Sequence, residues 1–263
     1  MGAIKIENFY FRNKNGVLTL HCAPLDAAGF EKHCFTTRKG GVSEGVLSGM
    51  NLSFSRECRE NVEENYRRIA NACGLSGNFV LTNQQHTDIV KEASVADGFV
   101  TFDDAVDGLV TDSEGICLTV FTADCVPVII ADPVTRSVAC VHSGWRGTAK
   151  RITANAVSLM KERYGADPKD MLCAIGPCIR KCCYEVGKDV LDGFGDSRFF
   201  EAKQDGKFML DLGYANTEVL KSAGIPSQNI FDCKECTYCK SDIYYSHRAT
   251  NGRRGNLAAM IEL

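Results

Sequence analysis

Two histidines and one cysteine stand where apolar, strand-like segments end. Cys125 follows the run LTVFTAD, His142 follows SVACV, and His86 lies in NQQHTDIV just after the strand-like FVLT. In α/β proteins, polar side chains at the ends of buried strands are where sites are usually built. Two imidazoles and a thiolate are good zinc ligands, and three protein ligands leave a fourth position open for water or substrate. The pattern therefore indicates a catalytic metal site.

The same three residues also allow a simpler interpretation. A histidine at a strand end is commonly a hydrogen-bonded structural residue, and a lone cysteine commonly fills space in a core. The three residues are far apart in the chain and match no compact zinc-finger spacing. Spacing alone leaves both interpretations open.

The cysteine-rich segment CKECTYC is a second possible ligand group. Cys233, Cys236 and Cys239 have the C-x-x-C-x-x-C spacing that can serve zinc or an iron–sulfur cluster. The bacterial ferredoxin pattern continues with a cysteine four residues later, where this chain has Ile243. A fourth thiolate would have to come from elsewhere, and the chain offers three candidates: Cys178, Cys182 and Cys183. In a chain with fourteen cysteines, chance clustering is the alternative.

Basic loops that contain glycine form a third candidate site. Arg38 lies in TTRKGGVSEG, Arg146 in SGWRGTAKR, and Arg248 in HRATNGRRGN. Backbone N–H groups at a helix start, together with a guanidinium group, suit phosphate. The spacings of a dinucleotide fingerprint, a P-loop and a G-x-S-x-G nucleophile elbow are all absent. The alternative is ordinary turns with solvated arginines.

The elements that must position these residues indicate a mixed α/β fold. Short alternating apolar stretches predict strands within residues 9–35, and apolar, β-branched runs predict buried strands within 115–144. Helical spacing that ends at a glycine predicts helices over 55–72 and 148–164. MLCAIGP is expected to be a further strand, DVLDGF and YANTEVLKSAG are expected to be helical, and YYSHRATNGRRGN is expected to be a loop before a short apolar end.

The composition is that of an ordinary globular protein. The chain has 263 residues, of which 44% are hydrophobic and 24% charged, and no linker or repeat divides it, so we expect one domain over 1–263. A formal charge of −3 gives no general attraction to nucleic acid or to an anionic membrane. The chain shows no signal peptide and no run of eighteen apolar residues, so we expect a cytoplasmic protein with reduced thiols.

Taken in order, these segments resemble the YfiH family, also called the laccase-domain or polyphenol-oxidase family and more recently a group of purine nucleoside phosphorylases. The resemblance covers about residues 35–256 and runs through TTRKGGVS, NLSFS, NQQHTDIV, DGLVTD, TADCVPVIIAD, VHSGWRGTAKRI and YSHR…GRRGN. It implies an α/β fold built as a layered α/β/β/α sandwich with mixed β-sheets. It also implies a metal held by His86, Cys125 and His142. Family members often carry an aromatic residue at the position of His247, so this histidine is not expected to be a ligand.

The name laccase can be tested by counting imidazoles. A multicopper oxidase needs about ten histidines for its copper sites. This chain has five, which excludes such an enzyme unless chains share sites. A single blue copper usually has a weak axial methionine, and no Met lies within ten residues of Cys125 or His142. Zinc is therefore expected in preference to copper.

The resemblance implies a zinc enzyme acting on purine nucleosides, by phosphorolysis of adenosine, inosine, guanosine and methylthioadenosine and by deamination of adenosine. Zinc suits deamination because it can lower the pKa of water to about 7. Phosphorolysis needs phosphate held below ribose C1′, for which Arg38, Arg146 and Arg248 are candidates. Arg38 is the first choice because the glycines beside it allow close approach. Asn51 and Gln85 are candidates for binding base or ribose.

Two alternatives belong to other classes. Cys125 beside a histidine resembles the nucleophile of a cysteine hydrolase, which would make the chain an amide hydrolase that corrects cell-wall peptidoglycan precursors. A binding protein without activity would retain zinc only for structure, but structural zinc usually has four protein ligands. The residues do not decide the preferred substrate, the oligomeric state, or how one site performs two reactions.

Overall fold

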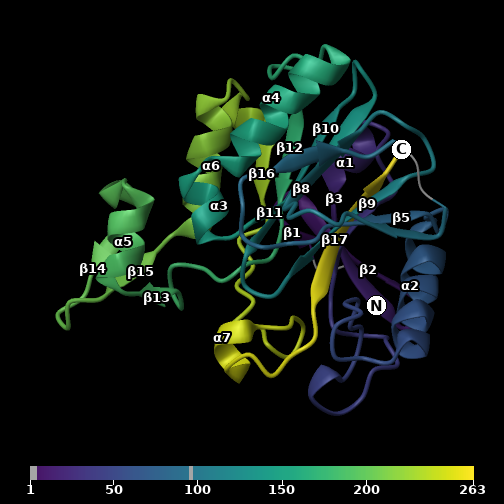
Figure 1. The fold of residues 1–263 in the computed structure, drawn as a ribbon, viewed down its shortest axis with the longest axis horizontal. Coiled ribbons are helices and arrows are strands. Elements are labelled where there is room, and N and C mark those ends of the chain that lie inside the picture. Colours follow the sequence, from purple (N-terminus) through teal and green to yellow (C-terminus); the bar gives the residue numbers. More distant parts are fainter. Residues whose placement is uncertain (1–4, 95–96) are drawn as a thin grey trace.

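The computed structural model describes residues 5–94 and 97–263 and arranges them in four layers (Figure 1). Two β-sheets pack face to face. Helices α4 (Ile152–Tyr164) and α6 (Leu212–Ser222) cover the outer face of one sheet, and α2 (Arg59–Cys73) covers the outer face of the other. The predicted α/β/β/α sandwich with mixed sheets is confirmed.

The strands of the described residues form three sheets. The eight-stranded sheet contains β1 (Lys5–Ile6), β2 (Phe9–Lys14), β3 (Val17–Cys22), β4 (His33–Thr36), β5 (Phe79–Leu81), β7 (Phe99–Thr101), β9 (Cys117–Thr122) and β17 (Leu257–Glu262). The six-stranded sheet contains β6 (Val90–Glu92), β8 (Gly108–Thr111), β10 (Val126–Asp132), β11 (Ser137–Ser143), β12 (Leu172–Ile175) and β16 (Ile230–Asp232). The small sheet contains β13 (Glu185–Val186), β14 (Phe200–Ala202) and β15 (Phe208–Leu210). The shorter helices are α1 (Ala23–Ala27), α3 (Trp145–Ala149), α5 (Lys188–Phe194) and α7 (His247–Thr250).

Both large sheets mix parallel and antiparallel neighbours. The strand orders are β1-β2-β3-β4-β17-β9-β5-β7 and β16-β12-β10-β11-β8-β6. Strand β5 runs parallel to β7 and β9, and β6 runs parallel to β8, whereas β10 and β11 are antiparallel. The C-terminal strand β17 lies between β4 and β9, so the short apolar end of the chain is an interior strand.

Strand β10 shows why the apolar runs of the middle segment form buried strands. All seven of its residues are buried. Val128 and Ile130 face the core beneath α4 and α6, whereas Ile129 and Ala131 face the other sheet. Successive side chains of a strand point to opposite faces, so a strand covered on both sides is apolar at every position.

The predicted helices are present, but they begin at other residues than predicted. Helix α2 begins at Arg59 rather than at residue 55, and it ends where Gly74 takes a φ of 74°. The single helix expected over 148–164 is two helices, α3 and α4. They are separated by Arg151, whose φ of 62° is left-handed and cannot continue a right-handed helix. The expected helices in DVLDGF and YANTEVLKSAG are α5 and α6, and the expected basic loop contains the short helix α7.

The small sheet and α5 project from the layered body as an arm, at the left of Figure 1. Within the described ranges no helix combines the length and the apolar character needed to cross a bilayer.

A candidate metal centre at the edge of the six-stranded sheet

Strand pairing brings together three residues that are far apart in the sequence. Strands β6, β8 and β10 run in the same direction, and β11 runs against β8 and β10. The pairing of Val126 with Ser143 places Cys125, just before β10, next to the end of β11 that carries His142. His86 lies in the loop before β6, at the same edge of the sheet.

The three side chains are close enough to share one ion. Their candidate ligand atoms all lie within 4.8 Å of one another. The Sγ of Cys125 is 3.8 Å from Nε2 of His86, and the rings of His86 and His142 meet edge to face with centroids 5.0 Å apart. Around one tetrahedral zinc, Zn–N and Zn–S bonds of about 2.1 and 2.3 Å place ligand atoms roughly 3.3–3.8 Å apart. This donor set therefore fits a zinc ion with small side-chain movements.

The local backbone is built for this close approach. His86 itself adopts a left-handed conformation with a φ of 60°. A Cβ atom at Gly144 would lie 2.7 Å from Cδ2 of His86 and 3.3 Å from Sγ of Cys125. Glycine is therefore the residue that fits between the end of β11 and the two candidate ligands.

Asp107 supports the centre from behind. This buried carboxylate, just before β8, accepts hydrogen bonds from the backbone N–H groups of Gln85, His86 and Thr87 and from the Thr87 hydroxyl. Its Oδ1 is also 2.7 Å from Nδ1 of His142. A carboxylate on the far nitrogen of a metal-binding histidine fixes the ring and its tautomer. The sequence reasoning missed Asp107, because it searched for polar residues where strands end, whereas Asp107 precedes a strand, at the beginning of the DGLVTD segment.

The electrostatics favour a thiolate beside an imidazolium in the metal-free site. Burial raises the pKa of Cys125, but the charge on His142 and hydrogen bonds to both histidines outweigh it and lower the pKa to about 6. Burial lowers the pKa of His142, but the Cys125 thiolate and Asp107 outweigh it and raise the pKa to about 9. Burial raises the pKa of Asp107, but His142 and Thr87 lower it to about 2. The thiolate that a metal or a nucleophile requires is thus available near neutral pH.

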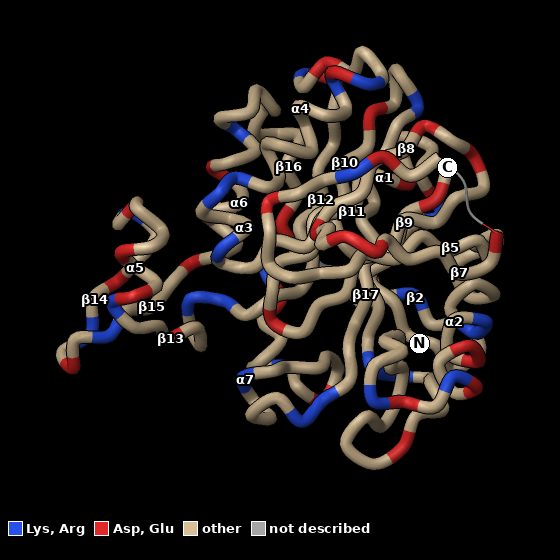
Figure 2. The backbone as a smooth tube through the Cα atoms, in the orientation of Figure 1, with Lys and Arg blue, Asp and Glu red and all other residues tan. Residues whose placement is uncertain are grey.

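Two cavities meet beside the centre. The metal-side cavity, of about 420 Å³, is lined by all three candidate ligands together with Phe121 and Gln84. The basic cavity, of about 540 Å³, is lined by four residues with cationic or imidazole side chains: Arg56, His247, Arg253 and Arg254. Ser55, Arg254 and Asn256 line both cavities, so the two cavities are neighbours. Figure 2 shows basic positions on α7 and on the segment that leads from α7 to β17.

Arg254 stands between the two cavities. Its Nη1 donates to Asn256, and its Nη2 lies 3.5 Å from Nδ1 of His247. Its Nε is buried and has no hydrogen-bond partner among the described residues. A buried, unpaired guanidinium donor is costly, so an anion in the cavity would satisfy it.

The arginines singled out from the sequence lie elsewhere, since neither cavity is lined by Arg38, Arg146 or Arg248. Arg38 donates to the carbonyl oxygens of Ser48 and Ser241 and so joins two loops. Arg146 is exposed and lies over the neighbouring Trp145 ring. Arg248 donates through its guanidinium to the carbonyl of Glu185 and through its backbone N–H to Asp124.

The two amide residues also have defined places. Asn51 lines the basic cavity, but its Oδ1 already accepts the backbone N–H groups of Ser53 and Asn256. Gln85 is exposed, and its neighbour Gln84 lines the metal-side cavity instead.

The remaining histidines do not build a second catalytic metal site. His21, Asp26 and His33 cluster inside the protein. Both ring nitrogens of His33 are engaged, with the backbone N–H of Cys22 and the carbonyl of Phe30. His247 lines the basic cavity. All five histidines lie in the described residues, and two of them meet at the centre, which is far fewer than a multicopper site requires.

Comparison with known proteins places this chain among named enzymes. A family model described as multi-copper polyphenol oxidoreductase laccase matches residues 32–263. A purine nucleoside phosphorylase of Deinococcus radiodurans is 37% identical over 234 residues, covering 88% of this chain and 88% of that protein. The purine nucleoside phosphorylase YlmD of Geobacillus stearothermophilus is 33% identical over 240 residues, covering 86% and 88%. The adenosine deaminase RL5, from an unknown prokaryotic organism, is 32% identical over 231 residues, covering 81% and 87%.

Solved structures share the whole architecture. The crystal structure of YlmD from Geobacillus stearothermophilus superimposes with a TM-score of 0.86 at 31% identity, covering 96% of this chain and 98% of that one. The Bacillus licheniformis hypothetical protein YfiH gives the same TM-score at 29% identity with the same coverage. The likeness therefore includes all four layers and the edge at which the candidate ligands meet.

Proposed function

The chain belongs to the multi-copper polyphenol oxidoreductase laccase family, and from that membership we propose that it is a zinc-dependent enzyme of purine nucleosides. The reactions proposed are phosphorolysis of the nucleoside and deamination of adenosine, which are the activities named for its relatives. The observation that carries the proposal is the meeting of His86, Cys125 and His142 in the lining of one cavity, which shares Arg254 with a neighbouring basic cavity.

Zinc is the proposed metal because two imidazoles and one thiolate form a typical catalytic zinc set, with one coordination position left open. When bound, zinc would supply Lewis acidity that activates water or polarises a substrate group. The chain's own residues prepare the site for it. Asp107 keeps a proton of His142 on Nδ1, so Nε2 is the nitrogen that would give up its proton and bind the metal.

The two neighbouring cavities suggest one orientation of the nucleoside for both reactions. The purine would lie against Phe121 in the metal-side cavity, with its C6 edge toward the three candidate ligands. The ribose would lie near Asn256, and phosphate would occupy the basic cavity. Water addition at C6 releases ammonia, whereas attack at C1′ takes place at the opposite end of the nucleoside. The two reactions would thus use two ends of one binding site.

Arg254 and Arg56 are the proposed phosphate ligands. In phosphorolysis a phosphate oxygen bonds to C1′, the C1′–N9 bond breaks, and its electron pair leaves with the purine, which takes up a proton. The buried Nε of Arg254 has no hydrogen-bond partner among the described residues. Arg56, in the loop before α2, lines the same cavity. Guanidinium groups bind phosphate oxygens in pairs and hold them in a fixed direction.

The test exploits the fact that deamination needs no phosphate. Zinc-loaded protein is incubated with adenosine or inosine, with and without phosphate, and purine, ribose 1-phosphate and ammonia are measured. Arg254→Met should raise the KM for phosphate about 10- to 100-fold, the effect of losing one charged hydrogen bond, and leave the rate of deamination within a few-fold. Cys125→Ala should abolish both reactions.

Arg163→Met is the matched control, because Arg163 is exposed on α4 and lines neither cavity. It should leave both reactions unchanged. Zinc-loaded protein that releases neither purine base nor ammonia from any of the nucleosides would contradict the proposal. Equal loss of both reactions in Arg254→Met would contradict the assignment of phosphate to the basic cavity.

A second candidate function is favoured by one observation, the chain of contacts from Cys125 through His142 to Asp107. A thiolate with a pKa of about 6 beside a histidine held by a carboxylate is the arrangement of a cysteine hydrolase. Such an enzyme would hydrolyse amides of peptidoglycan precursors without metal. Amide cleavage that persists after chelation and is stopped by alkylation of Cys125 would favour this candidate, and nucleoside turnover that requires zinc would exclude it.

A further inference from the structure

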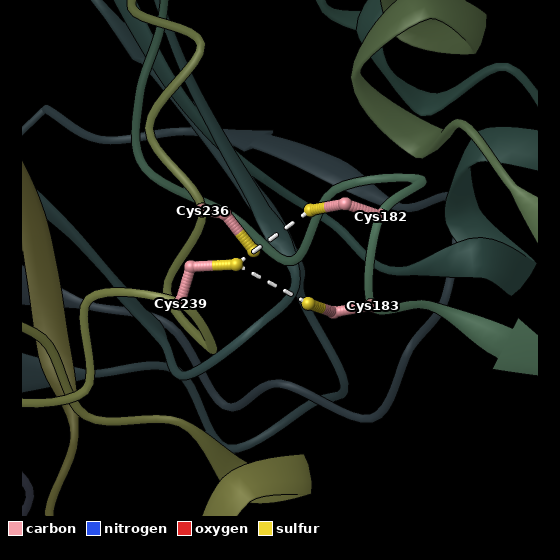
Figure 3. A group of neighbouring side chains, drawn as sticks. All are labelled: Cys182, Cys183, Cys236 and Cys239. Atoms are coloured by element: carbon pink, nitrogen blue, oxygen red, sulfur yellow. Dashed lines mark hydrogen bonds between the residues drawn. The ribbon is translucent and has the colours of Figure 1, made fainter.

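Four cysteines from two distant loops gather at the surface, away from the candidate metal centre. Figure 3 shows the side chains of Cys182, Cys183, Cys236 and Cys239 pointing toward one another. All four sulfur atoms lie within 4.8 Å of one another. Cys236 is buried, Cys183 is half-buried, and the other two are exposed. All fourteen cysteines of the chain are free thiols.

The spacing of the sulfur atoms fits one tetrahedral ion. The Cys182–Cys239 and Cys183–Cys239 sulfur distances are 3.8 and 3.3 Å. Zn–S bonds of about 2.3 Å place the sulfurs of a tetrahedral site roughly 3.8 Å apart. A disulfide requires about 2.05 Å. An iron–sulfur cluster places iron and sulfide between the thiolates and would spread them beyond the roughly 4.6 Å that two Zn–S bonds span.

The two loops are held together by contacts that do not involve the four thiols. The backbones of Cys178 and Cys236 form a parallel bridge, in which the N–H of Cys178 donates to Glu235 and the N–H of Thr237 donates to Cys178. Arg180 of the first loop donates two hydrogen bonds, one of them 2.8 Å long, to the carboxylate of Asp232, the last residue of β16 before the second loop. A site preformed in this way loses little conformational entropy when an ion binds.

Local turns orient the individual sulfurs. The N–H of Cys183 donates to the carbonyl of Arg180, which turns the chain so that Cys182 and Cys183 face the second loop. The N–H of Lys240 donates to the carbonyl of Cys236, a turn that brings Cys236 and Cys239 to the same side of the second loop.

We propose that Cys182, Cys183, Cys236 and Cys239 bind one zinc ion as a structural site separate from the nucleoside site. The four thiols give up their protons to solvent as the ion binds, and all four positions of the ion are filled by protein. This set differs from the consecutive C-x-x-C-x-x-C set that the sequence offers. Cys233 is buried at 1% exposure and is not part of the group, with its sulfur 3.9 Å from Arg180.

The proposed ion would stabilise the two loops that support the candidate metal centre. Thr237, next to Cys236, donates through its hydroxyl to Asp124, the neighbour of Cys125. The carbonyl of Glu185, shortly after Cys183, accepts from Arg248, whose backbone N–H also donates to Asp124. Zinc at the four cysteines would therefore stabilise the two loops that hold the segment before β10.

The test counts metal in a background without the nucleoside site. Full-length Cys125→Ala protein, purified with zinc and dialysed, should retain one zinc per chain by elemental analysis, and the unsubstituted protein should retain two. Adding Cys182→Ser and Cys239→Ser to Cys125→Ala should reduce the content to zero. Adding Cys58→Ser, an exposed cysteine outside the group, should leave it at one. If the four cysteines bound no zinc, the Cys125→Ala protein would contain none. If the nucleoside site bound no zinc, only the zinc content of the unsubstituted protein would fall, so the two failures are distinguishable.

A second measurement needs no variant and so does not depend on folding. In native protein loaded with zinc, alkylation followed by mass spectrometry should leave the four cysteines unmodified, and all four should react after chelation. Exposed Cys58 should react in both states. Reaction of the four thiols at equal rates with and without zinc would overturn the proposal, as would a Cys183–Cys239 disulfide in freshly isolated protein or the absorbance of an iron–sulfur cluster.

Discussion

Replacement of Asp107 by Asn tests whether this carboxylate sets the proton of a metal ligand. Its Oδ2 accepts the backbone N–H groups of Gln85 and Thr87 and the hydroxyl of Thr87, and its Oδ1 faces the N–H of His86 and Nδ1 of His142. An amide keeps a single acceptor oxygen and turns the other position into a donor. One of the two sets of partners must therefore lose its acceptor.

The smaller loss arises when the amide oxygen replaces Oδ2. The opposite orientation would leave the two backbone N–H groups on that side unpaired, at about 1–3 kcal/mol each. With the NH₂ at the Oδ1 position, His142 can pair only by accepting at Nδ1, which moves its proton to Nε2. That nitrogen then has no lone pair for the metal. Loss of such a supporting partner reduces metal affinity about 10- to 100-fold, or about 1.4–2.7 kcal/mol.

Competition titration with a zinc chelator measures this loss, and urea unfolding of the metal-free protein separates it from damage to the fold. Asp112→Asn is the matched control, because Asp112 is exposed in the same segment. We expect Asp107→Asn to weaken zinc binding by the stated factor and Asp112→Asn to leave it unchanged. The reasoning is refuted if Asp107→Asn binds zinc within threefold of the unsubstituted protein. A fall in stability without a change in affinity would limit Asp107 to a role in the fold.

Three further outcomes are expected. Burial, the largest cause, lowers the pKa of His21 to about 2, so the unfolded chain takes up a proton that the folded chain does not. Unfolding free energy should therefore fall by about 2 kcal/mol between about pH 8 and pH 5. In urea titrations His21→Leu should remove this part of the pH dependence. An unchanged dependence of the unfolding free energy on pH would contradict the prediction. Gly144→Ala should lower zinc affinity in the same competition titration, because its Cβ would lie 2.7 Å from the His86 ring, and unaltered binding would argue against the assigned ligand. Ile130→Ala, in the core, should cost about 2–5 kcal/mol in urea unfolding, whereas Val134→Ala at an exposed position should change little.

The residue patterns by themselves determined the mixed α/β class and most of the elements, whereas the layered order was implied by the family resemblance. Apolar runs such as VPVIIADP can be buried on both faces only between two covering layers, and β10 is buried in that way. Glycines after the helices marked their ends, because Gly74 and Gly165 take the left-handed conformation there. The sequence did not predict the start of α2 or the break at Arg151. Both depend on contacts outside the helical segment itself.

The sequence also pointed to His86, Cys125 and His142, through their positions at strand ends and through the order of motifs. The strand-end argument alone left a structural role open for each. The resemblance supplied the grouping, and the pairing of β10 with β11 supplies its physical reason.

Only the tertiary structure decided which residues surround these three. Asp107 reaches His142 because β8 pairs with β11, and Arg254 reaches the cavity because α7 and β17 bring the C-terminal segment to the same edge. Arg38, the favoured arginine in the sequence, is instead bound by loop carbonyls. The four clustered cysteines were selected in the same way, by a bridge between two loops. A motif records neighbours along the chain, whereas strand register and loop docking bring together residues separated by tens of positions, and these are set by the packing of the whole fold.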